Sequence, residues 1–133
     1  MGARWVGTLT YLDYSKNKSV SIRSDLIVTE VPDHPASLEF SYIYPDEPKA
    51  NSKTTISIKN NGASLGDETL VSNTRIDTTT LKIITTNAGQ DNNRTAQFRF
   101  TYVLNARAFS ILKEVRVEGL ADYFERNRYE WRR

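Results

Sequence analysis

Short runs in which apolar and polar residues alternate fill the chain from Arg4 to Arg133, and polar turns separate these runs. In one of them Leu38, Phe40 and Tyr42 share a face, while Glu39 and Ser41 between them are polar. This period of two residues predicts strands that bury one face and expose the other. About nine or ten such runs fit into the sequence, and no segment of it predicts a long helix.

Strands are expected over residues 4–11, 19–31, 38–44, 54–59, 63–76, 80–86, 94–104 and 109–117, with a last strand from about Phe124. Asn60-Asn61-Gly62 predicts a hairpin, because Asn and Gly tolerate the positive φ of a type I′ turn. The segment 87–93 contains three asparagines and a glycine, and we expect it to form a long polar loop.

Strands that follow one another through short turns pair as neighbours, which gives a meander. An open meander leaves two unpaired edges, and closing it into a barrel removes both. The pattern therefore predicts one all-β domain over residues 1–133, an antiparallel up-and-down barrel of about 8 to 10 strands. A two-sheet Greek-key sandwich stays open as an alternative, because alternation alone does not distinguish the two.

The amino-acid composition excludes several kinds of functional site. The chain has 133 residues, a formal net charge of +2, one histidine and no cysteine. The charge is too small to indicate nucleic-acid binding, and the missing cysteines exclude disulfides, thiolate nucleophiles and cysteine-based metal sites. We expect no catalytic residues, no metal and no cofactor. No run approaches 18 apolar residues, so we expect no membrane span and a soluble protein, either cytoplasmic or exported with its signal peptide removed.

Trp5-Val6-Gly7 opens the first expected strand. A tryptophan beside a glycine at the start of an antiparallel barrel of this length resembles the calycin superfamily, which includes lipocalins and fatty-acid-binding proteins. Lipocalins usually have the order Gly-x-Trp, and here the order is reversed. The resemblance implies that the tryptophan closes the barrel floor against a basic side chain from a late strand. Arg126 and Arg128 are the candidates for that partner.

Aromatic residues on alternating positions indicate where a ligand would bind. Lys113 stands out because it shares a face with Phe109 and Ile111, and a buried ammonium needs a negatively charged partner. We expect Lys113 or Arg99 to meet the polar head of a ligand. The candidate ligand-binding residues are Tyr42, Tyr44, Phe98, Arg99, Phe100, Tyr102, Phe109 and Lys113. Two alternatives stay open: the aromatic residues fill the barrel, and a register break turns Lys113 to solvent.

Three functions fit these features. The first is a non-catalytic carrier or sensor of a small apolar or amphipathic ligand, in a lipocalin-like barrel. The second is a packed barrel that binds a partner protein or self-associates. The third is a barrel enzyme, such as an isomerase, in which tyrosine, glutamate and arginine side chains act on a hydrophobic substrate. A cavity distinguishes the first and third from the second.

Overall fold

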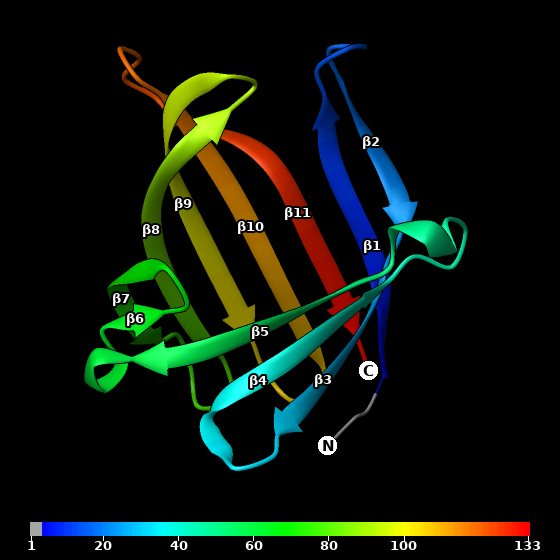
Figure 1. Ribbon diagram of the computed structural model, residues 1–133, viewed down its shortest axis with the longest axis vertical. Coiled ribbons are helices and arrows are strands. Elements are labelled where there is room, and N and C mark those ends of the chain that lie inside the picture. Colours follow the sequence, from blue (N-terminus) through cyan, green and yellow to red (C-terminus); the bar gives the residue numbers. More distant parts are fainter. Residues whose placement is uncertain (1–3) are drawn as a thin grey trace.

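A computed structural model describes residues 4–133, which form an all-β fold with two short 3₁₀ turns at Pro48–Ala50 and Asn60–Gly62. Figure 1 shows the strands wrapping around one interior. The strands are β1 (Arg4–Asp13), β2 (Lys18–Arg23), β3 (Asp25–Val31), β4 (His34–Ile43), β5 (Ser52–Lys59), β6 (Ser64–Leu65), β7 (Glu68–Arg75), β8 (Leu81–Asp91), β9 (Arg94–Leu104), β10 (Ala108–Val117) and β11 (Phe124–Arg132).

The sheet closes on itself through its first and last strands. From β3 to β11 every strand pairs antiparallel with the next, and β1 pairs with β11 from Val6↔Arg132 to Tyr11↔Asn127. The other edge of β1 pairs with β2 and, at Trp5, with β3. Ten strands thus form a closed ring, to which β2 is added through β1. This arrangement confirms the up-and-down barrel, and the sandwich alternative is wrong.

Gly7 makes the closure possible. A Cβ at this position would lie 1.8 Å from the carbonyl oxygen of Glu130 in β11. Only a residue without a side chain lets β1 and β11 approach this closely. The glycine of the Trp5-Val6-Gly7 motif therefore acts at the seam of the barrel.

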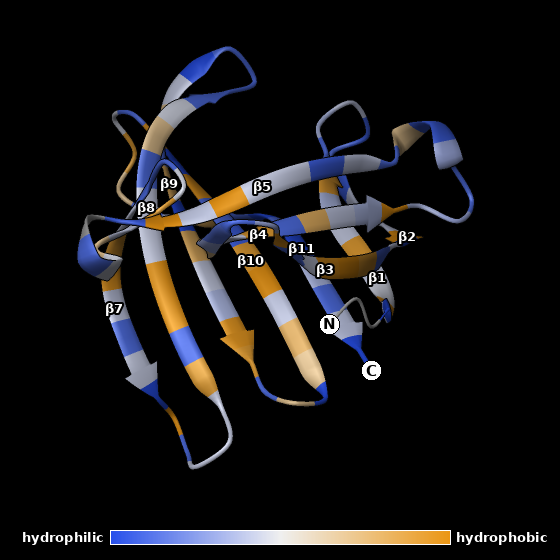
Figure 2. Cartoon of the chain, turned by 60° about the horizontal axis from the view of Figure 1, so that its bottom comes forward, coloured by the Kyte–Doolittle hydropathy of each residue, from blue (hydrophilic) through white to orange (hydrophobic). Residues whose placement is uncertain are grey.

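The barrel has two walls that cross. Strands β3, β4 and β5 run across the face of β8 to β11 at a large angle (Figure 1). Hydrophobic and hydrophilic bands alternate along β8, as expected for a wall with an inside and an outside (Figure 2). The space between the crossing walls holds the core at one end and an open pocket beside it.

Trp131 is the centre of the core. It is 1% exposed, its ring stacks on Tyr129 at 4.9 Å, and it lies 5.3 Å from the ring of Phe109. The buried core cluster comprises Leu26, Phe40, Tyr102, Ile111 and Trp131. A second cluster consists of Ala96, Phe98, Val115 and Val117. Trp5 is only partly buried and packs against the first cluster.

Several expected element boundaries are corrected by the structure. The segment 87–93 is not a long loop, because β8 continues to Asp91 and the turn is only Asn92-Asn93, with φ of 50° and 63°. Asparagine tolerates this left-handed conformation, so two residues suffice to reverse the chain. The expected strand 19–31 breaks at the buried Ser24 into β2 and β3, and 63–76 divides into β6 and β7.

The expected partner of Trp5 is also corrected. The guanidinium of Arg133 lies 5.0 Å from the Trp5 ring centroid. Arg126 bonds to Asp91 instead, and Arg128 pairs with Glu125. The antiparallel register explains the difference, because Trp5 lies at the end of β1 that faces the C-terminal end of β11. Arg126 and Arg128 lie toward the opposite end of that pairing.

Candidate functional site

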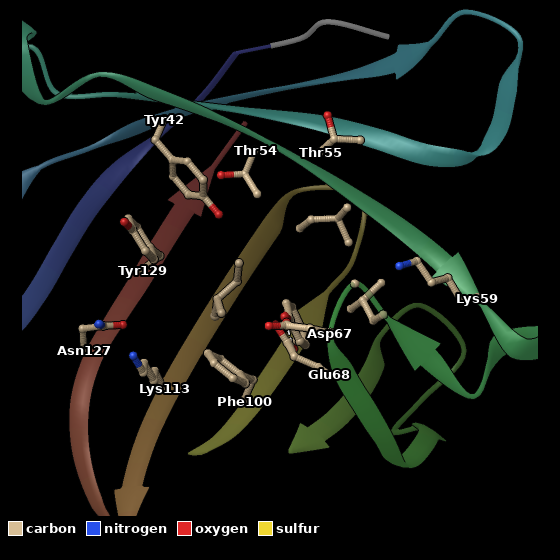
Figure 3. A pocket seen from close by; sticks show the side chains of 15 residues that line it. Tyr42, Thr54, Thr55, Lys59, Asp67, Glu68, Phe100, Lys113, Asn127 and Tyr129 are labelled. Carbon is tan, nitrogen blue, oxygen red and sulfur yellow. Dashed lines mark hydrogen bonds between the residues drawn. The ribbon is translucent and has the colours of Figure 1, made fainter. Parts of the chain in front are cut away.

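A pocket of about 480 Å³ opens between the crossing walls of the barrel. Strands β4 and β5 form one side, β9 to β11 form the other, and the segment joining β6 to β7 closes one end (Figure 3). The lining residues are Tyr42, Thr54, Thr55, Ile56, Lys59, Leu65, Gly66, Asp67, Glu68, Phe100, Tyr102, Ile111, Lys113, Asn127 and Tyr129. The volume lies within the range of small-molecule sites in proteins.

Three tyrosines from different strands line the pocket: Tyr42, Tyr102 and Tyr129. The hydroxyl of Tyr129 is 2.7 Å from that of Tyr44, and burial raises the pKa of Tyr129. The hydroxyl of Tyr42 points into the pocket and makes no hydrogen bond with the residues that the structure describes (Figure 3). Burial raises the pKa of Tyr42 to about 12. This hydroxyl is therefore a neutral group available to a ligand.

Lys113 projects into the same pocket. Its Nζ lies 4.3 Å from the ring centroid of Phe98 and 6.0 Å from that of Phe100. No ion pair joins it to another residue in the described part of the chain. Burial lowers its pKa, although the charges of Asp91 and Glu68 partly oppose that effect. The pocket therefore contains an ammonium group stabilised by aromatic rings but without a contacting carboxylate.

The register break considered from the sequence is present but does not turn Lys113 outward. It lies between Lys113 and Glu114, where β11 carries Arg126 as an extra residue. The pairs Lys113↔Asn127 and Glu114↔Glu125 lie on either side of it. Because the additional residue belongs to β11, the alternation along β10 continues and Lys113 keeps the inward face of Ile111.

Glu68 is the second ionisable group inside the pocket. Its Oε1 accepts hydrogen bonds from the Thr85 hydroxyl at 2.5 Å and from the Tyr102 hydroxyl at 2.7 Å. Burial raises its pKa, while these two hydrogen bonds act in the opposite direction. Both donors converge on one oxygen, so the carboxylate has a fixed orientation and its other oxygen remains available.

The predicted site residues divide among several places. Four of them line the pocket: Tyr42, Phe100, Tyr102 and Lys113. The Tyr44 hydroxyl contacts that of Tyr129, the Phe98 ring contacts the Lys113 ammonium, and Phe109 belongs to the core around Trp131. Arg99 does not line the pocket. It pairs with Glu114 at 2.9 Å and lies over the Tyr123 ring at 4.0 Å, on the other face of β9.

Sequence reasoning missed the acidic end of the pocket. Asp67 and Glu68 come from the weakly patterned segment 63–76, where β6 has only two residues and a register shift interrupts β7. Asn127 was missed because the extra residue Arg126 disturbs the alternation of β11. In the sequence, only the adjacency of Asp67 and Glu68 indicated an acidic site, and adjacency alone does not show which way either side chain points.

A second cluster of polar side chains lies outside the pocket lining and links several segments of the barrel. Asp91, which is 8% exposed, accepts hydrogen bonds from Arg126 Nε at 3.1 Å and from the Tyr14 hydroxyl. The Arg126 guanidinium also lies 4.4 Å from the Tyr14 ring centroid and donates to the Leu12 carbonyl. These contacts link the β1–β2 turn to β8 and β11. They occupy the Arg126 guanidinium, so we do not count Arg126 among the ligand-binding residues.

Comparisons with known proteins add no assignment. No protein-family model matches the sequence, and no curated protein is significantly similar to it. Within residues 4–133 no helix has the length and apolar character needed to cross a membrane. The same residues contain no cluster of three histidine, cysteine, aspartate or glutamate side chains suited to a metal ion.

Proposed function

We propose that this protein is a lipocalin-like barrel that binds a small amphipathic molecule with an acidic group. The observation that carries the proposal is the unpaired Lys113 ammonium in a pocket walled by tyrosine and phenylalanine rings. An apolar body would contact Phe100, Ile111 and Tyr129, while its anionic group would approach Lys113. The calycin resemblance at Trp5-Val6-Gly7 and the closed up-and-down barrel support the same proposal.

The chemistry of Lys113 favours an anion over a neutral ligand. An ammonium removed from water is destabilised unless a negative charge or hydrogen-bond acceptors compensate for the lost hydration. Aromatic rings supply part of this compensation, about 0.5–2 kcal/mol for a cation over a ring. A bound carboxylate would supply the direct contact that the described protein groups do not make.

Titration with an environment-sensitive fluorescent fatty acid tests the proposal. Wild type should bind it saturably. Lys113→Met should weaken acidic ligands and leave neutral ligands of the same shape unaffected. Lys82→Met is the matched control, because Lys82 alternates with the inward Ile83 and lies on the outer face of β8. Equal losses in the two variants would show that general charge attraction, rather than the pocket, attracts acids.

A second variant tests the location of the apolar body. Phe100→Trp adds volume to the pocket wall and should block acidic and neutral ligands alike. If wild type binds no acid and no neutral lipophile saturably, the binding proposal fails, and the packed barrel that acts through its surface becomes the better account. Turnover of a bound compound would instead support the enzyme alternative.

A further inference from the structure

The pocket has two polar ends of opposite character. Lys113 and Asn127 lie together on one side, while Asp67 and Glu68 lie on the other (Figure 3). Phe100 lies between them, because it pairs with Thr85 of β8 on one edge and with Lys113 of β10 on the other. A ligand that contacts only the basic end leaves the acidic end without a partner.

The basic end consists of two side chains that donate hydrogen bonds, Lys113 and Asn127. Lys113 and Asn127 are direct cross-strand partners, so their side chains project from the same face of adjacent strands. Neither side chain makes a hydrogen bond or ion pair with the rest of the described chain. An ammonium beside an amide is a suitable site for one carboxylate, which accepts from both groups.

At the acidic end the Glu68 carboxylate has a fixed orientation, because two hydrogen bonds from the described residues reach one of its oxygens. Thr85 and Tyr102 both donate to Oε1 of Glu68, and no residue in the described part of the chain donates to Oε2. Glu68 is partly buried, and a desolvated carboxylate gains more from an added donor than an exposed one does. No basic residue contacts Glu68 within residues 4–133, so a donor from a ligand would add a contact without displacing one.

We propose that the preferred ligand of this pocket is a short acid that also carries a hydrogen-bond donor, a hydroxyl or an ammonium, at its opposite end. This inference rests on the proposed function and specifies its ligand. The carboxylate would bind Lys113 and Asn127, the donor would bind Glu68, and the body would lie over Phe100. A simple fatty acid fills only the first of these positions and places methylenes against a carboxylate that needs a donor.

The strand spacing limits the length of such a ligand. Thr85 and Lys113 are separated by β9, so their backbones lie about 10 Å apart, or two spacings of roughly 4.8 Å. Side chains reaching into the pocket from both positions shorten the span that remains. A single ring with two substituents matches this span better than a long chain, and the neighbouring Tyr42 and Tyr129 rings favour an aromatic body.

Calorimetric titration with phenylacetate and its derivatives tests the inference. The derivatives are 3- and 4-hydroxyphenylacetate, the corresponding methoxy compounds and 4-(aminomethyl)phenylacetate. At least one hydroxylated or aminomethyl acid should bind about tenfold or more tightly than phenylacetate, because it donates to a charged acceptor. The methoxy compounds should lose this advantage, since they keep the oxygen but cannot donate.

Glu68→Gln assigns the effect to one residue. Glutamine keeps the oxygen that accepts from Thr85 and Tyr102 but removes the charge. It should abolish the advantage of the aminomethyl acid over phenylacetate. Asp67→Asn, which removes the neighbouring charge of the pocket, should change the ratio by less than about twofold. An effect confined to Asp67→Asn would overturn the assignment to Glu68.

The outcomes separate this inference from the proposed function. Saturable binding of phenylacetate that is lost in Lys113→Met, with no advantage for any donor-bearing acid, would overturn the inference and support the binding proposal. Absence of saturable binding for every acid, including the fluorescent fatty acid, would overturn both. A donor advantage that survives Glu68→Gln would overturn the inference, because the donor would then not bind Glu68.

Discussion

Replacing Trp131 by alanine should destabilise the protein more than replacing Trp5. Trp131 is 1% exposed and lies within 4.9–6.2 Å of the rings of Tyr129, Phe109 and Tyr42. Truncating a fully buried tryptophan typically costs ~3–5 kcal/mol. For a chain of this length, a loss of about 4 kcal/mol would lower the melting temperature by roughly 12–20 °C. Trp5 is partly buried, so Trp5→Ala should cost about 2 kcal/mol.

Trp131→Phe provides an internal test of the packing argument. The indole Nε1 of Trp131 is buried and has no hydrogen-bond partner among residues 4–133. Phenylalanine removes that unsatisfied donor, whose burial costs about 1–3 kcal/mol, while it keeps one aromatic ring. The loss should therefore fall below about 2 kcal/mol. Urea unfolding followed by circular dichroism measures all three variants. A Trp131→Ala protein more stable than Trp5→Ala would refute the reasoning.

Three further predictions concern charges and a turn. Burial raises the pKa of Glu68 above its ordinary 4.5, so wild type should lose stability relative to Glu68→Gln as pH rises above 4.5, measured by urea unfolding. Asn93 has a φ of 63°, so Asn93→Ala should cost about 1 kcal/mol in the same assay, whereas Asn93→Gly should cost nothing measurable. Asp91→Asn should lower the free energy of unfolding by about 3 kcal/mol, because Asp91 is buried against Arg126. Glu125→Gln, at an exposed ion pair, should change it by less than about 1 kcal/mol. Equal effects of these two charge removals, or of the two Asn93 substitutions, would contradict the account.

The barrel was predictable because alternation is a local signal. The strand 94–104 was expected with the bounds that β9 has, and the long β10 follows its apolar positions closely. The extension of β8 to Asp91 was not predictable from hydrophobicity. Its last residues include Asn87 and Gly89, and the added Cβ of any other residue at Gly89 would lie 2.8 Å from the Phe98 ring. Packing against a neighbouring strand, which no local pattern reports, keeps this polar segment extended.

The candidate site was predictable only on one side. Tyr42, Phe100, Tyr102 and Lys113 lie on strongly alternating strands, so their shared face followed from the period of two. Glu68 lies at the first position of β7, beside a two-residue strand and before a register shift. A side-chain direction cannot be assigned to such a segment without its partners, because one residue of slip reverses the face. The contact between Arg133 and Trp5 was missed for a related reason. It depends on the register in which β1 pairs with β11 to close the barrel.

Ligand binding inside the barrel is tested most directly by NMR titration of ¹⁵N-labelled protein with a short amphipathic acid such as 4-hydroxyphenylacetate. The account predicts saturable shifts of the amide signals of Phe100, Lys113 and Asn127, with little change on the outer face at Lys82. Lys113→Met should abolish the shifts of Phe100 and Asn127 at the same ligand concentration while the rest of the spectrum stays that of the folded protein. Shifts that grow linearly without saturation, or that spread over the outer face, would contradict a binding site in this pocket.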